Sequence, residues 1–448
     1  MSRSVNKQKS LAGEFLAGHG MDHRQVDMAE CMEAFIGEMK KGLAQENGSS
    51  LQMLPTFLDA ENPLPMDKPV AVIDMGGTNF RTGVLVFRKN GKREIFNFSQ
   101  YPVPGSDPDQ SSDSFYNQIA DAAAPLLKGS VDTIGFCFSY PMEMTRNHDG
   151  KILMCTKSLR AEAVKGSLLS AGLARSLQER HSSAAPKIVL INDAIAALLS
   201  GKAAGLTRSF SANIGFILGT GMNCAYREKN ENIIKVSDLE NNKYQIINTE
   251  AGLFDKAVRG DLDRLYDSES PNPGKLLFEK MIGGGYFAGL IRTVMLAAGR
   301  EGLFSDYFSE AVLKYRNITT EDLNDFLKAP LSSSLIADFL ARDQNEKNEL
   351  LFFIISELIE RGAKYAAVML SSVIKQTGAG QDPEKPVCIS ANGTTFYKLR
   401  NLKERIDYYL KGFCTDIFGC HYAFAEVKNA PLVGAGVAAL CSGVYHTG

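Results

Sequence analysis

The chain has 448 residues, of which 44% are hydrophobic, and this length favours two packed lobes of ordinary size over a single core. Lys and Arg (49) nearly balance Asp and Glu (51), so the sequence predicts no broad field that would gather nucleic acid or anionic membrane. The eight cysteines form no C-x-x-C pair, and neither a signal peptide nor an apolar run of ~18 residues is recognisable. We therefore expect a cytoplasmic protein without nucleic-acid or membrane partners.

The N-terminal region, residues 1–60, is predicted to form a helical appendage, because apolar residues recur at helical spacing above a charged face. From Pro69 onward the pattern changes to short strands. We expect residues 61–205 to form a smaller lobe, with the C-terminal helix 434–448 as a candidate to rejoin it. Residues 206–433 are predicted to form a larger, helix-rich lobe. The expected fold class is therefore α/β.

Short apolar runs that end in polar groups predict the strands, and one long, densely apolar stretch predicts a buried helix over residues 350–376. The predicted strands are residues 70–74, 82–87, 133–138, 187–191, 212–218 and 223–227. A glycine-containing turn joins two consecutive strands twice in the chain. This repetition indicates that both lobes share one design.

The first of these turns lies in the segment Asp74-Met75-Gly76-Gly77-Thr78-Asn79-Phe80-Arg81. Its glycines allow the backbone to approach a phosphate closely and to point N–H groups toward it. Asp74, at the end of an apolar strand, is a candidate to hold Mg²⁺ through water. The alternative is an ordinary hairpin turn, which needs glycines in any case. The segment is not a Walker A loop, because that motif requires G-x-x-x-x-G-K-[ST].

The second turn, Gly219-Thr220-Gly221, could hold phosphates from the opposite side, and two such cradles would suit phosphoryl transfer. Between the two turns, Asn192-Asp193 follows a predicted strand and precedes a predicted helix. Asp193 is either a reactive carboxylate or the N-cap of that helix, and the local sequence leaves both readings open.

These turns, in this order, resemble the hexokinase family of the actin-like ATPase superfamily over roughly residues 60–445. Further strings carry the resemblance: Gly135 to Pro141, Asp149 to Leu153 followed by Thr156-Lys157, and Asn248 to Phe254. The most specific string is Asn272 to Ile282, which contains Phe278-Glu279-Lys280-Met281. The resemblance implies two actin-like (ribonuclease H-like) lobes with a cleft between them.

The resemblance also implies an ATP-dependent hexokinase that phosphorylates the 6-hydroxyl of a glucose-like hexose, with Mg²⁺ as cofactor and closure of the lobes over the sugar. Asp193 would be the general base, and Lys157 would stabilise developing charge. The implied hexose ligands are Ser139, Thr156, Lys157, Asn192, Asp193, Asn223, Glu250 and Glu279. The implied ATP and phosphate ligands are Asp74, Gly76, Gly77, Thr78, Asn79, Arg81, Gly219, Thr220, Gly221, Gly393 and Thr394.

Two alternatives remain open from the sequence. The adenosine-like string around Gly393 has Asn392 where the family usually has Asp, which leaves room for a catalytically weak hexose sensor on the same scaffold. A chaperone-like or filament-forming ATPase of the same superfamily is the other, and the hexose-binding strings argue against it. The preferred hexose, the nucleotide donor, the regulation and the oligomeric state, monomer or homodimer, are not predicted.

Overall fold

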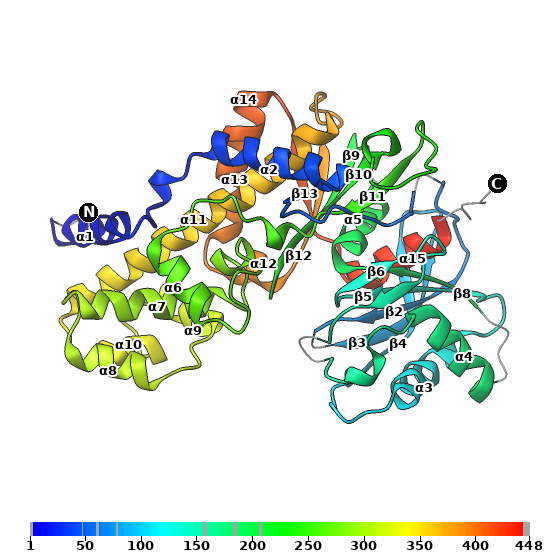
Figure 1. The fold of residues 1–448 in the computed structure, drawn as a ribbon, viewed down its shortest axis with the longest axis horizontal. Helices are drawn as coiled ribbons and strands as arrows, with labels where there is room; N and C mark the ends of the chain where they lie inside the picture. Colours follow the sequence, from blue (N-terminus) through cyan, green and yellow to red (C-terminus); the bar gives the residue numbers. More distant parts are fainter. Residues whose placement is uncertain are drawn as a thin grey trace.

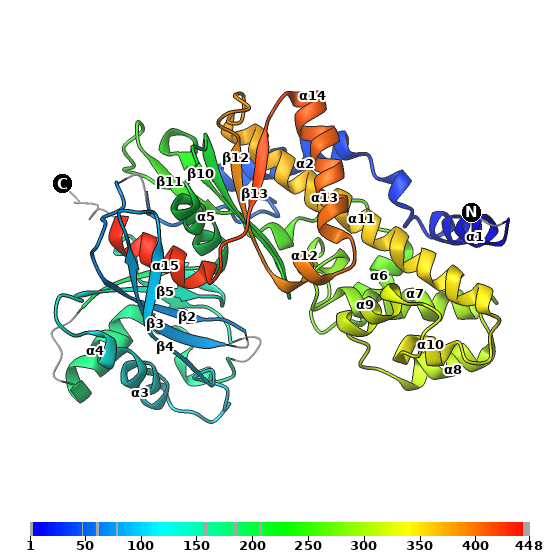
Figure 2. The same ribbon diagram turned by 180° about the vertical axis from the view of Figure 1, so that it is seen from behind.

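The computed structural model describes residues 3–46, 48–59, 62–77, 79–155, 159–181, 186–205 and 208–441. The chain folds into two lobes, each built around a mixed sheet (Figures 1 and 2). The N-terminal helix and the last helix lie at opposite ends of the molecule. Within the described ranges, no helix combines the length and the apolar character that crossing a bilayer requires.

The sheet of the first lobe has five strands in the order β4-β3-β2-β5-β8. The strands are β2 (Val70–Met75), β3 (Phe80–Phe87), β4 (Arg93–Tyr101), β5 (Thr133–Phe138) and β8 (Lys187–Ile191). β2, β3 and β4 are antiparallel neighbours, whereas β5 runs parallel to both β2 and β8. A small hairpin of β6 (Met142–Met144) and β7 (Gly150–Ile152) lies beside this sheet.

Strand β2 shows why the inner strands of this sheet are continuous apolar runs in the sequence. Successive side chains of a strand point to opposite faces, and every residue of β2 is buried. Val70 and Val72 pack toward α15 (Ala430–Cys441), whereas Ala71 and Ile73 pack toward α3 (Ser112–Ala123) and α4 (Leu169–His181). Both faces of the sheet are therefore covered by helices.

The sheet of the second lobe has six strands in the order β1-β11-β10-β9-β12-β13. They are β1 (Leu54–Pro55), β9 (Ala212–Leu218), β10 (Met222–Lys229), β11 (Tyr244–Asn248), β12 (Val387–Asn392) and β13 (Tyr422–Ala425). The hairpin β9–β10 is antiparallel, and β12 joins β9 in parallel. The first lobe has the same relation in β2, β3 and β5, so the repeated design predicted from the sequence is confirmed.

Most of the remaining helices belong to the second lobe, which is helix-rich as predicted. They are α6 (Asp261–Glu269), α7 (Phe287–Arg300), α8 (Asp306–Lys314), α9 (Thr320–Lys328), α10 (Leu335–Phe339), α11 (Asn345–Thr377), α12 (Thr394–Lys398), α13 (Leu402–Leu410) and α14 (Asp416–Phe418). The N-terminal helices α1 (Arg3–Gly18) and α2 (Met28–Ala44) both pack against α11.

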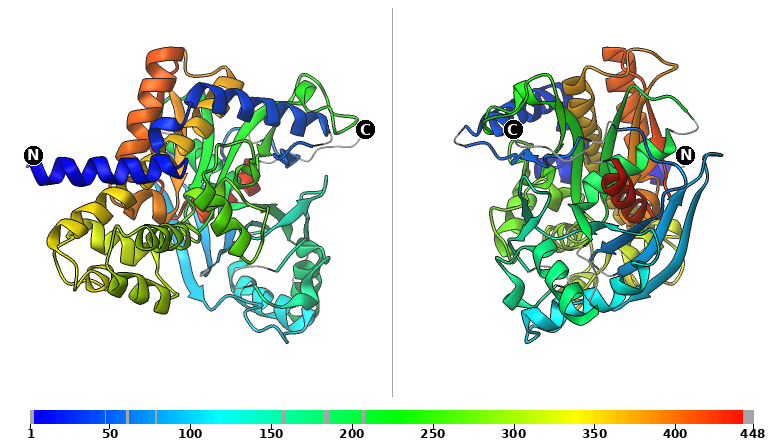
Figure 3. Two further views of the ribbon diagram at one scale, coloured as in Figure 1. Left: turned by 60° about the vertical axis from the view of Figure 1, so that its left-hand side comes forward. Right: turned by 90° about the vertical axis from the view of Figure 1, so that its right-hand side faces the viewer.

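Two helices separate the sheets: α5 (Asp193–Ala204) and α15 (Ala430–Cys441). α15 packs on β2, β5 and β8, α5 packs on β9, β10 and β12, and the two helices pack against each other. Figure 3 shows α15, in red, between the strands of the two lobes. The last helix was expected over residues 434–448. It begins earlier, at Ala430, and its first turn includes Pro431, a residue that helices tolerate at that position. Residues 442–448 lie outside the described part.

These layers contact closely enough to exclude a β-carbon. A Cβ on Gly434 of α15 would overlap the backbone of Ala196 in α5, and would lie 2.5 Å from its Cα. A Cβ on Gly215 of β9 would overlap the carbonyl oxygen of Ala194 and would lie 2.6 Å from the nitrogen of Leu198. The start of α5 is therefore held directly against the sheet of the second lobe.

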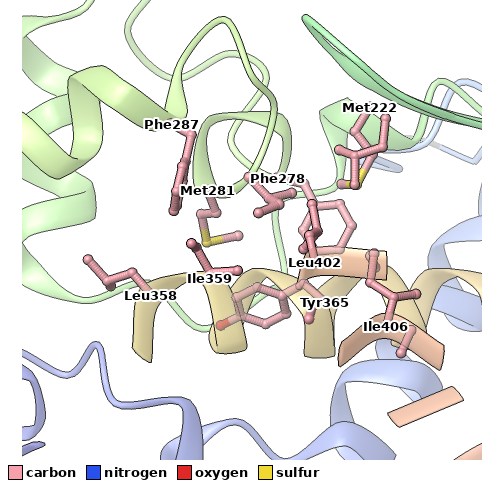
Figure 4. Packing of buried hydrophobic residues seen from close by; sticks show 14 of the residues in the cluster. Met222, Phe278, Met281, Phe287, Leu358, Ile359, Tyr365, Leu402 and Ile406 are labelled. Carbon is pink, nitrogen blue, oxygen red and sulfur yellow. The ribbon is translucent and has the colours of Figure 1, made fainter. Parts of the chain in front are cut away.

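The largest apolar core lies in the second lobe, beneath the β9–β10 hairpin. Figure 4 shows Met222 and Phe278 among side chains of α11 and α13, including Tyr365 and Leu402. All four residues are at most 2% exposed. Because Met222 precedes Asn223 and Phe278 precedes Glu279, this core anchors two residues that the sequence assigns to hexose binding.

Candidate active site

Asp74 lies near the end of β2, where the strand register places it opposite Arg81 of β3. Nε of Arg81 donates to Oδ2 of Asp74 over 2.9 Å, and the carboxylate is 2% exposed. Burial raises the pKa of Asp74 and the charge of Asp193 adds to that rise, whereas Arg81 opposes it. The buried Asp74 carboxylate and the half-buried Asp193 carboxylate, which come from different elements, are therefore near enough to influence each other.

The first turn closes between these strands. The backbone nitrogen of Gly76 donates to the carbonyl of Asn79 over 2.9 Å, and Gln100 of β4 donates to Oδ1 of Asn79 over 2.9 Å. The hydroxyl of Tyr140 donates to the carbonyl of Gly76 over 2.8 Å. This anchoring role of Tyr140 was missed, although Tyr140 lies in a string that the sequence singled out. Thr78 lies outside the described residues.

Asp193 opens α5, but it is not the N-cap. Asn192 caps the helix, because its Oδ1 accepts from the backbone nitrogen of Ile195 over 3.0 Å. The Asp193 carboxylate accepts from the nitrogen of Ala194 over 2.8 Å. Its charge and that of Asp74 add to the effect of burial in raising the pKa of Cys137 on β5. Asp193 therefore lies beside the first sheet while its helix rests on the second.

The second turn joins β9 to β10. The nitrogen of Gly219 donates to the carbonyl of Gly221 over 2.9 Å, and the Thr395 hydroxyl donates to the carbonyl of Gly219 over 2.8 Å. Gly393 has φ +127°, a conformation that favours glycine, and its position against Leu218 leaves no room for a β-carbon. A Cβ on Gly219 would lie 3.4 Å from Gly393 Cα and 3.8 Å from the nitrogen of Thr394. The structure thus brings Gly393 and Thr394 to the second turn.

The predicted hexose ligands of the second lobe form two linked groups. Oε2 of Glu279 accepts from the nitrogen of Met222 over 2.8 Å, which places the carboxylate directly behind the second turn. Asn223 donates to Asn248 over 2.8 Å, and Asn248 donates to Glu250 over 2.7 Å. A Cβ on Gly252 would lie 3.1 Å from Oε2 of Glu279 and 3.2 Å from the Met222 carbonyl, so the two groups are neighbours.

The start of α5 lies next to these ligands. Ala194, the residue after Asp193, contacts Gly215 of β9. Gly215 pairs with Ala225 of β10, two residues beyond Asn223. Ser139 is placed on the first lobe by the bond from its nitrogen to the Met75 carbonyl, 3.0 Å. Thr156 and Lys157 lie outside the described residues.

A pocket of about 390 Å³ beside the second turn was not predicted. Gly284 and Gly285, which line it, donate to the carbonyls of Gly219 and Thr220, each over 2.8 Å. Residues 316–320 form another part of its wall, and Thr320 donates to the Gly284 carbonyl over 2.7 Å. The run Gly283-Gly284-Gly285 was the available signal. The pocket adds space next to a turn already assigned to phosphates.

Comparison with known families decides the identity of the fold. A family model described as hexokinase matches residues 213–441, about half of the chain, and a second model described as hexokinase matches residues 17–203. The chain belongs to the hexokinase family. The match begins earlier than the sequence motifs indicated, so it includes most of the segment expected to be an appendage.

Relatives in this family are distant. The chain is 30% identical to human hexokinase HKDC1 over 292 residues, which are 62% of this chain and 31% of that protein. It is 25% identical to human hexokinase-2 over 427 residues (91% and 46%), and 26% identical to the hexokinase-like 1 protein of Arabidopsis thaliana over 451 residues (92% and 87%). The alignments thus span less than half of either human protein.

Solved hexokinase structures share the fold. The hexokinase from Schistosoma mansoni complexed with glucose aligns with a TM-score of 0.77 at 21% identity, covering 98% of this chain and all of that one. A second hexokinase crystal structure aligns with a TM-score of 0.78 at 20% identity, covering 98% and 99%. The actin-like two-lobed fold predicted for this hexokinase-family chain is therefore confirmed.

Proposed function

We propose that the chain is an ATP-dependent hexokinase that transfers the γ-phosphoryl group of MgATP to the 6-hydroxyl of a glucose-like hexose. The observation that carries this proposal is the position of Asp193. It lies at the start of α5, near Asp74 of the first turn, and its helix rests on β9 beside Asn223. A base at this position would serve a hexose held by the second lobe and a nucleotide held by the turns.

In this reading, Asn223, Glu250 and Glu279 bind hexose hydroxyls from the second lobe, and Ser139 and Asn192 bind them from the α5 side. Directional hydrogen bonds of this kind discriminate hydroxyl geometry. Asp193 accepts the proton of the 6-hydroxyl as its oxygen attacks phosphorus. Thr156 and Lys157 are proposed to complete the hexose site, with Lys157 stabilising the developing charge.

The nucleotide phosphates are proposed to lie between the two turns, with Gly76, Gly77, Thr78 and Asn79 on one side and Gly219, Thr220 and Gly221 on the other. Gly393 and Thr394 adjoin the second turn, where they would contact the nucleotide. Backbone N–H groups of such turns favour anions without requiring a lysine. The pocket beside Gly284 lies within reach of a nucleotide bound at the second turn.

The charged groups fit a Mg²⁺ ion. The Asp74 and Asp193 carboxylates lie near each other, and carboxylates are the side chains that Mg²⁺ prefers in proteins. Asp74 is 2% exposed, so it would hold the ion through water rather than directly. When bound, Mg²⁺ neutralises charge on the transferring phosphoryl group.

Exclusion of water would require the two lobes to close over the sugar. α5 and α15 are the packed layers about which such a motion would occur. Outside these layers, Nη2 of Arg146, in the turn between β6 and β7, donates across the lobes to the carbonyl of Ser237 over 2.8 Å. Closure is proposed to rearrange this bond.

The test is an assay of the purified full chain with ATP and a panel of glucose, mannose, fructose and N-acetylglucosamine. Asp193→Asn should lower kcat by roughly 10²–10⁴-fold and leave hexose affinity nearly unchanged, because a general base contributes to the transition state. Asp121→Asn, on the exposed face of α3, is the matched control and should retain wild-type turnover. Wild-type turnover by the Asp193 variant would refute the assigned base.

Hexose binding without turnover by the wild-type chain would instead identify the hexose sensor. Turnover of ATP that does not depend on sugar would point to an ATPase of the same superfamily. Calorimetric titration with glucose, run beside the turnover assay, separates these outcomes.

A further inference from the structure

Asn248, the last residue of β11, links two of the proposed hexose ligands. Its Oδ1 accepts from Nδ2 of Asn223 over 2.8 Å and from the backbone nitrogen of Glu250 over 3.4 Å. Its Nδ2 donates to Oε1 of Glu250 over 2.7 Å. Asn248 is only 6% exposed, so both the oxygen and the nitrogen of its side-chain amide are bonded to groups inside the protein.

The backbone fixes the direction of each side-chain hydrogen bond in the series from Asn223 through Asn248 to Glu250. Oδ1 of Asn223 accepts from the nitrogen of Cys224 over 2.7 Å and from the nitrogen of Ala251 over 3.2 Å. Since a backbone N–H can only donate, the Asn223 amide must turn its oxygen toward these two groups and its Nδ2 toward Asn248. Asn248 must then present its oxygen to Asn223 and its Nδ2 to Glu250.

Glu250 has an unusual backbone conformation that Asn248 helps to hold. Its φ is +54°, in the left-handed region, which costs a residue with a β-carbon about 1–2 kcal/mol. Asn248 contacts both the backbone nitrogen and the carboxylate of Glu250, so one amide side chain restrains both ends of the residue. Strained residues of this kind persist where the surrounding structure over-determines them.

We propose that Asn248 is a positioning residue for hexose binding, because it fixes Asn223 as a donor and orients the Glu250 carboxylate as an acceptor toward the sugar. Nδ2 of Asn223 carries two hydrogens, and the one not given to Asn248 is assigned to a hexose hydroxyl oxygen. This inference rests on the proposed function, since it assigns a role to the same site.

The test replaces Asn248 by its acidic isostere. In Asn248→Asp the new carboxylate cannot donate to Glu250, and two carboxylates then meet unless one of them is protonated. We expect the hexose Kd, measured by calorimetry, to rise by roughly tenfold or more at about pH 8, and to recover partly at about pH 5.5 as the pair takes up a proton. The KM for ATP should stay near the wild-type value.

The matched control is Asn232→Asp. Asn232 makes the same kind of bond in the same lobe, from its Nδ2 to Oε1 of Glu228 over 2.7 Å, but it lies in the connection between β10 and β11, at the end of that hairpin away from Asn248. This variant should keep the wild-type hexose Kd at both pH values. Equal shifts in the two variants would show a general effect of a lost Asn–Glu bond and would overturn the proposal.

A double variant keeps the test decisive if Asn248→Asp alone does not fold. In Asn248→Asp with Glu250→Gln, the bond re-forms with reversed direction, because the Gln amide donates to the Asp carboxylate. We expect this protein to fold and to bind hexose weakly at both pH values, without the pH-dependent recovery. Wild-type affinity in the double variant would overturn the proposal.

The outcomes distinguish this inference from the proposed function. If the wild-type chain binds no hexose, both are overturned. If the wild-type chain binds hexose and Asn248→Asp binds it with the same Kd across the pH range, only the positioning role of Asn248 is overturned.

Discussion

Replacing Gly434 by Ala tests the close contact between α15 and α5. The new Cβ would lie 2.5 Å from Cα of Ala196 and 2.6 Å from its carbonyl carbon, whereas carbon atoms pack at about 3.5–4.0 Å. The helices would have to separate by about 1 Å, since the obstructing atoms are backbone. Overpacking of this kind costs about 1–3 kcal/mol, and the better helix propensity of Ala returns about 1 kcal/mol. Because the obstructing backbone atoms cannot turn aside as a side chain could, we expect the upper part of that cost, about 2–3 kcal/mol, and a net loss of about 1–2 kcal/mol.

Gly37→Ala in α2 is the matched control, because no atom beyond the adjoining backbone of its own helix lies within 4 Å of the Cβ it would introduce. Here the propensity gain is unopposed, so the free energy of unfolding should rise by about 0.5–1 kcal/mol. Urea denaturation of both variants, followed by circular dichroism, measures the two changes. If the Gly434 variant unfolds at the wild-type urea midpoint or above it, the inferred contact between the helices is wrong.

Two further predictions concern charged groups outside the active site. Arg361 makes a bidentate ion pair with Asp263 over 2.7 Å and is 1% exposed. Arg361→Met should therefore lower the free energy of unfolding by about 3–5 kcal/mol, because it leaves a buried carboxylate without its partner. Adding Asp263→Asn should recover part of this loss in urea denaturation, and no recovery would contradict the reasoning. Burial opposes protonation of His19, but its bonds to Asp261 and Glu301 outweigh burial and raise its pKa. The stability from these bonds is therefore complete below about pH 6.5 and is lost as pH rises through the raised pKa, and His19→Gln should remove that dependence. An unchanged pH profile of the unfolding midpoint in His19→Gln would refute this assignment.

Four of the five strands in the sheet of the first lobe were predicted, because their signal is local, whereas the mostly exposed β4 was missed. β5 and β8 have the predicted bounds, Thr133–Phe138 and Lys187–Ile191, since a strand buried on both faces is a continuous apolar run bounded by polar residues. The long helix α11 begins five residues before its predicted start, at Asn345, because its first turn is polar and lacks the apolar density on which the prediction relied.

The candidate active site was predicted as a set of residues, but not as a set of contacts. The role of Asn192 as N-cap and the anchoring of Gly76 by Tyr140 depend on which neighbour each polar group meets, and local sequence leaves that open. The same holds for Asn248, because one of its partners, Asn223, lies on the neighbouring strand and the other, Glu250, lies two residues further along the chain. Hydrogen-bond direction is a tertiary property, so no spacing pattern encodes it.

The place of α15 in the first lobe has a consequence for the order of events on the ribosome. The strands of that lobe end at Ile191, but the helix that covers one face of their sheet begins about 240 residues later, at Ala430. At 5–20 residues per second, the nascent sheet would wait roughly 12–50 s with Val72 and Val189 uncovered. During synthesis this face is a natural target for chaperones, and a chain that stops short of α15 would expose it permanently.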